Sequence, residues 1–133
     1  MSRNPPHEGM NGLAWEALQL FVSAATRACR GRVDKFVVFG SRARGDPTDG
    51  SDLDVAVVLL DPHVDHYREK MGLADLAYDA IVETGVHLQP WPISLAEWRD
   101  PETHTNPSLV RAMRRDGLVI EGEYVPRAVF QGA

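Results

Sequence analysis

The most constraining feature of this sequence is a pair of hydrophobic runs joined by a short polar segment. The first run, VDKFVVFG, covers residues 33–40, and its β-branched and aromatic residues are typical of a strand. The second, DLDVAVVLLD, covers residues 52–61, and its continuous apolar end indicates burial on both faces of a sheet. The segment between them contains the breakers Pro47 and Gly50 and is too short for a crossover helix. We therefore expect two strands that pair in antiparallel orientation.

Helical periodicity is found on both sides of this pair of strands. Apolar residues recur at helical spacing from Leu13 to Cys29, and the glycine of the following RGR segment suits a helix C-terminus. A second helical pattern covers about residues 64–83 and stops at Gly85. The remaining segments are expected to be a strand at 86–94, a turn with a capping box formed by Ser94 and Glu97, a helix at 107–115 and a short edge strand at 118–122.

The order of these elements predicts the architecture. Strand 52–61, the helix after it and strand 86–94 form a crossover unit, whose two strands run parallel. Together with the antiparallel pair, this unit gives a small mixed sheet flanked by helices, an α/β or α+β fold. The chain of 133 residues suits one domain. We place that domain at residues 13–121, with a flexible N-terminal arm at 1–12 and a C-terminal tail at 122–133.

Composition excludes several classes of protein. The net charge of −5 argues against a broad nucleic-acid surface, because that mode of binding depends on clustered Lys and Arg. Cys29 is the one cysteine, which excludes an internal disulfide and a cysteine-based zinc site. No window approaches the roughly 18 apolar residues of a membrane span, and the N-terminus is polar and rich in Pro and Gly. A cytoplasmic protein without membrane contact is therefore expected.

Two aspartates stand at the beginning of the second strand. Asp52 and Asp54 are separated by one residue, so in a strand their side chains point to the same face. Two carboxylates this close repel each other unless a cation lies between them, and hard oxygen ligands suit Mg²⁺. A magnesium site is therefore expected at the start of this strand.

A Gly-Ser turn ends the first strand, at Gly40 and Ser41. It leads into a possible helix start, where backbone N–H groups, a hydroxyl and a permissive glycine backbone can bind phosphate. Arg42 and Arg44 add positive charge close by. A phosphate site that faces a two-carboxylate metal site is the minimum equipment for phosphoryl or nucleotidyl transfer.

The stretch GSRARGDPTDGSDLDVAVVL resembles the signature of the DNA polymerase β-like nucleotidyltransferase superfamily, and more narrowly that of the prokaryotic minimal nucleotidyltransferases. The resemblance is specific over residues 36–59 and looser over 13–121. It implies transfer of a nucleoside monophosphate from a nucleoside triphosphate, with ATP expected, to a hydroxyl, in a reaction that depends on a divalent metal. The nucleotide-binding residues are then expected to be Gly40, Ser41, Arg42, Arg44 and Ser51, and the metal ligands Asp52 and Asp54, which also count as catalytic.

Within the minimal group, the resemblance implies a protein acceptor, often a small helical HEPN toxin encoded beside the transferase. The transferase then acts as the antitoxin, either by modifying the toxin or by binding it. A chain of this size has little room for an acceptor-binding domain, which fits a separate partner. A small-molecule transferase of the aminoglycoside-modifying kind is less favoured, because such enzymes usually need a second domain or a dimer. A homo-oligomer stays open.

The third strand departs from the superfamily pattern. Active members generally carry a third acidic residue there, which completes a second metal site and helps to deprotonate the attacking hydroxyl. The polar face of this strand instead presents His87 and Gln89, and His87 is the best positional match for the catalytic set. Loss of general-base assistance costs on the order of 10²–10⁴ in rate.

Three interpretations of this departure are open. His87 could act as the base or as a nitrogen ligand, which would favour Mn²⁺ over Mg²⁺. One metal carried by the nucleotide could support weak activity. Alternatively, the chain is a binding module or antitoxin on a catalytically decayed fold.

Other polar and aromatic residues are assigned structural roles. We expect Trp15, Trp91 and Trp98 to pack against apolar neighbours rather than to stack on a base. His63 and His66, which flank Asp65, are expected to lie in a loop, and a metal cluster is the less favoured alternative. The basic residues of the last helix, Arg111, Arg114 and Arg115, are expected to form its solvated end, and contact with a nucleotide or a partner is the less favoured alternative.

Overall fold

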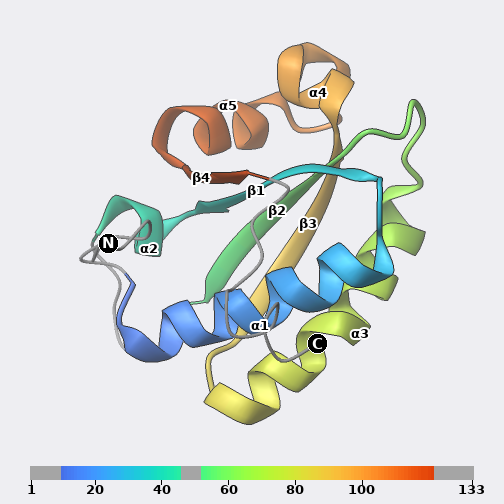
Figure 1. The fold of residues 1–133 in the computed structure, drawn as a ribbon. Helices are drawn as coiled ribbons and strands as arrows, with labels where there is room; N and C mark the ends of the chain where they lie inside the picture. The colour runs from blue at the N-terminus through green and yellow to red at the C-terminus, as the bar shows by residue number, and fades with distance from the viewer. Residues whose placement is uncertain (1–9, 46–51, 122–133) are drawn as a thin grey trace.

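The computed structural model describes residues 10–45 and 52–121, and within these ranges it contains a four-stranded sheet in the order β3-β2-β1-β4. Helices α1 and α3 lie on one face of the sheet, and α4 and α5 lie on the other (Figure 1). In chain order the elements are α1 (Gly12–Ala28), β1 (Val33–Phe39), α2 (Ser41–Arg44), β2 (Leu53–Leu59), α3 (His66–Thr84), β3 (Leu88–Ser94), α4 (Leu95–Arg99), the 3₁₀ helix η1 (Pro101–Thr103), α5 (Pro107–Asp116) and β4 (Leu118–Glu121).

Strand pairing confirms the expected mixed sheet. Strand β1 pairs antiparallel with both β2 and β4, whereas β2 pairs parallel with β3 after the crossover through α3. The capping box of Ser94 and Glu97 is also confirmed, at the start of α4. Element ends differ from the expected ones by a few residues, and His66, which was expected in a loop, is instead the first residue of α3.

The sheet separates two hydrophobic clusters. The larger one joins α1 and α3 to one face, where Phe21 of α1 meets Phe36 of β1 edge to face at a centroid distance of 6.2 Å. Complete burial of such a side chain contributes about 1.5–3 kcal/mol. The cluster on the other face consists of Val37, Phe39, Ala56, Val58, Ile93, Val110 and Met113, with Trp91, Leu95, Trp98 and Leu109 packed against it. Trp91 and Trp98 therefore pack as expected, and Trp15 does so against the larger cluster.

The beginning of α1 is fixed by residues that precede its expected start. The Asn11 side chain accepts a hydrogen bond from the backbone N–H of Ala14 at 2.8 Å, which caps the helix. Met10 is buried in the larger cluster. Residues 10–12 thus belong to the folded part of the chain. The rest of the expected arm and the whole of the expected tail lie outside the described residues, and the division of the chain otherwise stays a prediction.

The composition raised expectations about two features, the single cysteine and the apolar character of the helices. Cys29 is buried at the end of α1, and this burial raises the pKa of its thiol, which favours the packing role. Over residues 10–45 and 52–121, none of the helices combines the length and the apolar character that a bilayer crossing requires.

Helix α5 ends at Gly117, which lies tightly against β1. A Cβ atom at this position would lie 2.3 Å from the carbonyl oxygen of Met113 and 2.4 Å from Cγ1 of Val37. Only a residue without a side chain therefore allows α5 to pack on β1 in this way.

We expect Gly117→Ala to lower the free energy of unfolding by about 1–3 kcal/mol, because the methyl group overpacks the contact between α5 and β1. Gly72→Ala is the matched control, since Gly72 lies within α3 and a Cβ placed on it would meet no atom within 4 Å. That control should stabilise the protein by about 0.5–1 kcal/mol through helix propensity. Urea denaturation measures both, and equal stability of the two variants would contradict the close packing.

Candidate active site

Asp52 and Asp54 lie at the start of β2 and face the side of the sheet that carries α4 and α5. Alternate strand residues share a face, and Ala56 and Val58, which continue this alternation, belong to the cluster on that side. The register pairs Asp54 with Phe39 at the end of β1 and with Gln89 in β3. The predicted pair of carboxylates is therefore on one face, and the residue beside Asp54 on β3 is an amide rather than an acid.

Asp54 is held from two sides. Its Oδ1 accepts a hydrogen bond from the indole Nε1 of Trp91 at 3.1 Å. Its Oδ2 lies 2.8 Å from the point where a Cβ on Gly40 would be. The Gly-Ser turn and the second aspartate are therefore in contact, and a side chain at residue 40 would collide with the carboxylate.

Electrostatics at Asp54 fit a cation site. Burial raises the pKa of Asp54 above its usual range, the hydrogen bond from Trp91 opposes this rise, and the negative charge of Asp52 adds to it. A divalent cation between the two carboxylates would remove their repulsion and stabilise both charged forms. The donor set of oxygen atoms suits Mg²⁺ or Mn²⁺.

His87 lies beside Asp52 rather than Asp54. Its Nδ1 is 3.1 Å from Oδ1 of Asp52, and both side chains are substantially exposed, at 58% and 43%. The backbone fixes this arrangement, because the carbonyl of His87 accepts the N–H of Leu53 at 2.9 Å. The structure thus brings together His87 and the aspartate that precedes β2.

Helix α2 carries the expected nucleotide-binding residues. Gly40, with a φ of 82°, precedes the helix, and Gly45, with a φ of 83°, follows it. Ser41, Arg42 and Arg44 all lie on this single helical turn, which the buried Ala43 fixes to the larger cluster. Of the other expected residues, Ser51 lies outside the described residues.

Trp91 and Lys70 also lie at the candidate site, although the sequence does not predict a role there for either residue. Trp91 packs against Phe39 at a centroid distance of 6.2 Å, as its apolar neighbours suggested, but it also donates to Asp54. The Nζ of Lys70, from α3, lies 3.9 Å from the centroid of the Trp91 ring and donates to the carbonyl of Pro90 at 2.8 Å. Burial lowers the pKa of Lys70, and Asp54 opposes that shift.

Period-2 alternation along β3 was a usable signal for Trp91, because residues 87, 89 and 91 share one strand face. Lys70 gave no such signal, since its position depends on how α3 packs at the edge of the sheet.

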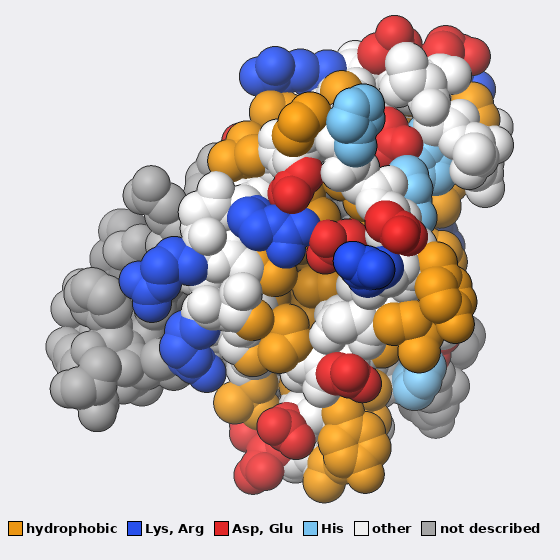
Figure 2. Space-filling view, turned by 90° about the vertical axis from the view of Figure 1, so that its right-hand side faces the viewer, with side chains coloured by type: hydrophobic (Ala, Val, Ile, Leu, Met, Phe, Trp, Pro, Cys, Tyr) orange, Lys and Arg blue, Asp and Glu red, His pale blue; other side chains and the backbone are white. Residues whose placement is uncertain are grey.

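A cavity of about 270 Å³ adjoins these residues. Its lining includes Lys70 and Trp91 together with His66, His104 and Asn106. On the face shown in Figure 2, Lys and Arg side chains are interspersed with acidic ones, and histidine side chains lie in the upper part and also at the lower right. Elsewhere, three arginines of α5 line a more open hollow of about 400 Å³: Arg111, which pairs with Glu102, Arg114, and Arg115, which pairs with Asp116.

The contact between Gly40 and Asp54 is tested by comparing two glycines that both have a positive φ. Gly31 has a φ of +80° and Gly40 of +82°, but no atom lies within 4 Å of a Cβ placed on Gly31. Both alanine variants should lose stability through strain at a positive φ, and Gly40→Ala should lose more, because the ψ of −158° at Gly40 lies in a region that is essentially limited to glycine. Gly40→Ala should in addition displace Asp54 from Trp91 and shift the indole N–H resonance of Trp91 in an NMR spectrum. An unchanged resonance in Gly40→Ala would contradict the contact.

Known proteins share both the sequence pattern and the fold. The family of the nucleotidyltransferase domain matches residues 23–122. The chain is 46% identical over 43 residues to a Methanocaldococcus jannaschii protein named "Putative protein adenylyltransferase", and the match covers 32% of this chain and 43% of that one, less than half its length. A crystal structure of a putative nucleotidyltransferase from Sulfolobus solfataricus has the same fold, with a TM-score of 0.51 at 15% identity over 89% of this chain and 90% of that one. Because the family match covers most of its length, this chain belongs to the nucleotidyltransferase domain family.

Proposed function

We propose that this chain is a minimal nucleotidyltransferase that transfers a nucleoside monophosphate, with ATP as the expected donor, to a hydroxyl group on a protein. The observation that carries the proposal is the contact of the Gly-Ser turn with Asp54, in a chain whose residues 23–122 match the family. The name of the Methanocaldococcus jannaschii relative supports a protein as the acceptor.

Asp52 and Asp54 are the residues that would hold a divalent cation, Mg²⁺ or Mn²⁺. When bound, such an ion neutralises triphosphate charge and the charge that develops during transfer. Trp91 orients Asp54 for this role through its indole N–H. Gly40, Ser41, Arg42 and Arg44 form the proposed triphosphate site, as the superfamily resemblance implies.

His87 is the proposed general base. If the proton of the neutral ring lies on Nδ1, it is donated to Asp52 at 3.1 Å, and Nε2 keeps its lone pair. The Nε2 atom can then accept the proton of the attacking hydroxyl, a role that a third carboxylate has in related enzymes. The half-exposed position of His87 leaves room for a large acceptor to approach.

The proposed acceptor is a separate helical protein of the HEPN toxin type, which the chain would neutralise as an antitoxin in the cytoplasm. Support for this part is the resemblance to the minimal group. A second candidate function is an antitoxin that binds its toxin on a decayed transferase fold, and the observation in its favour is that His87 and Gln89 stand where an acid is expected.

Replacement of both aspartates tests whether they are needed for nucleotidyl transfer. We expect Asp52→Asn with Asp54→Asn to reduce metal-dependent transfer of radiolabel from α-labelled ATP to a co-purified protein to background. Asp75→Asn with Asp79→Asn is the matched control, because it makes the same chemical change at two exposed positions of α3. Undiminished labelling by the first variant would remove these aspartates from the site.

Variants of His87 distinguish the two candidate functions. If His87 is the base, His87→Gln should slow transfer by about 10²–10⁴ while leaving nucleotide affinity within about twofold. His87→Asp should then recover part of the rate. A chain that labels no partner until His87→Asp is introduced would instead identify the decayed binding module, and calorimetry with ATP and Mn²⁺ would show whether it still binds nucleotide.

A further inference from the structure

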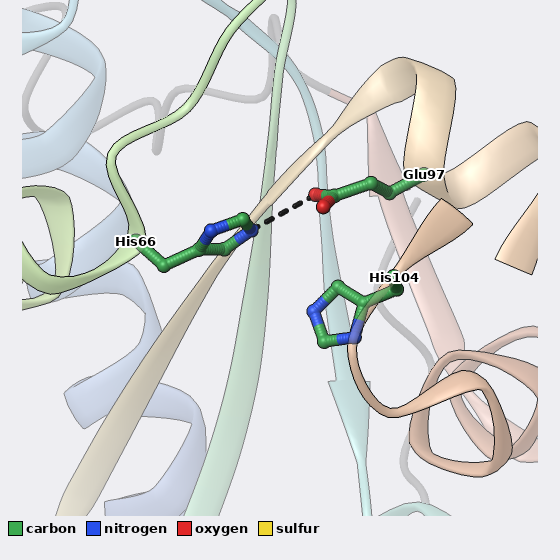
Figure 3. A group of neighbouring side chains, drawn as sticks. All are labelled: His66, Glu97 and His104. Atoms are coloured by element: carbon green, nitrogen blue, oxygen red, sulfur yellow. Dashed lines mark hydrogen bonds and ion pairs between the residues drawn. The ribbon is translucent and has the colours of Figure 1, made fainter. Parts of the chain in front are cut away.

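Two histidines and a glutamate from three separate elements converge beside the cavity. His66 is the first residue of α3, Glu97 lies in α4, and His104 follows η1. One ligand atom from each lies within 4.8 Å of the other two. Figure 3 shows both imidazole rings and the carboxylate directed toward a common centre. The Nε2 of His66 is 3.0 Å from Oε1 of Glu97, and the two rings are perpendicular at a centroid distance of 5.4 Å.

We propose that His66, Glu97 and His104 form a site for a divalent transition metal, with Zn²⁺ as the expected ion, separate from the aspartates of β2. Two imidazole nitrogens and one carboxylate oxygen favour Zn²⁺ over Mg²⁺, which prefers oxygen ligands alone. Ligand atoms of a tetrahedral zinc site lie about 3.3 Å apart, given bonds of about 2.0–2.1 Å. Small side-chain movements would bring these three atoms to that spacing.

The ligand-bearing residues are held in place before any ion arrives. Oε1 of Glu97 accepts the backbone N–H of Ser94 at 2.9 Å within the capping box. Asp65 caps α3 and so fixes the turn that carries His66. Although burial raises the pKa of Glu97, its bonds to Ser94 and His66 more than offset that effect and hold the pKa below the usual range.

Both histidines must give up the proton on Nε2 to bind the ion. The Nε2 of His66 donates its proton to Glu97 at 3.0 Å, and ligation moves that proton to Nδ1 and replaces this bond. His104 must change its tautomer in the same way. Its Nδ1 accepts the backbone N–H of Asn106 at 2.9 Å, so in the neutral ring the proton lies on Nε2, the atom that faces the cluster. Ligation through Nε2 moves this proton to Nδ1 and gives up the bond to Asn106, the residue that caps α5. The loss of this bond favours an exchangeable ion over a permanently held one.

Three protein ligands leave one position of a tetrahedral site for water or for a ligand atom. His66 and His104 also line the cavity of about 270 Å³ that contains Lys70 and Trp91. Trp91 in turn donates to Asp54. An ion here would tie α3, α4 and the segment before α5 together at the wall of a cavity next to the candidate active site.

Titration of metal-free protein with Co²⁺ tests the site without any assay of transfer. We use the Asp52→Asn with Asp54→Asn background, so that the aspartates do not contribute. Visible absorption of four-coordinate Co²⁺, displaced by Zn²⁺ with a stoichiometry near one, is the expected result. His104→Gln and His66→Gln should each weaken Co²⁺ binding by at least about tenfold. His63→Gln, an exposed histidine outside the cluster, is the matched control and should bind normally.

The change in Tm that Zn²⁺ causes in each variant is a second measure of metal binding, and it can be compared between variants of different stability. Zn²⁺ should raise the Tm of the background protein and of His63→Gln, but not that of His104→Gln or His66→Gln. The proposal is wrong if the background protein shows no Co²⁺ absorption, or if the two ligand variants bind Co²⁺ as tightly as the control. His66 and Glu97 would then form an ion pair, with His104 only packed beside it.

Discussion

The register of β1 on β2 determines where the chemistry of this molecule can take place. Pairing of Phe39 with Asp54 brings Gly40, one residue further along, against the second carboxylate. A slip of one residue would turn Asp52 and Asp54 toward α1 and α3, where the larger cluster is apolar. The apolar residues of β1 and β2 fix the register because each face of the sheet has its own cluster. The hydrophobic pattern therefore positions the polar site.

Trp91 connects packing with electrostatics. Its ring packs against Phe39 in the smaller cluster, and its indole N–H donates to Asp54. The ammonium group of Lys70 lies over the face of the same ring. A carboxylate that is partly withdrawn from water needs such partners, because its charged form is otherwise disfavoured. Substitution by Phe would keep the ring in place and leave Asp54 without this donor. A residue that packs against the smaller cluster thus also supports the charged state of a candidate metal ligand.

Short-range patterns in the sequence were enough to predict the mixed sheet, the capping box at Ser94 and the shared face of Asp52 and Asp54. These features depend on the period of a strand, on local capping and on the length of a connection. The proximity of Lys70 to Trp91, and of His66 to His104, could not be predicted in this way. Both pairs are created by the packing of α3 at the edge of the sheet and by the path of η1. Neither of these tertiary features produces a periodic pattern in the sequence.

Edge strand β3 contains Pro90 and Pro92, neither of which has a backbone N–H, and the carbonyl of Pro90 is already bonded to Lys70. A foreign strand that tried to extend the sheet here would lack donors at two alternate positions and would have to displace a lysine. This edge is thereby protected against strand-to-strand aggregation. A protein that docks over β3 must use side-chain contacts instead, so its specificity would come from shape and charge rather than from backbone pairing.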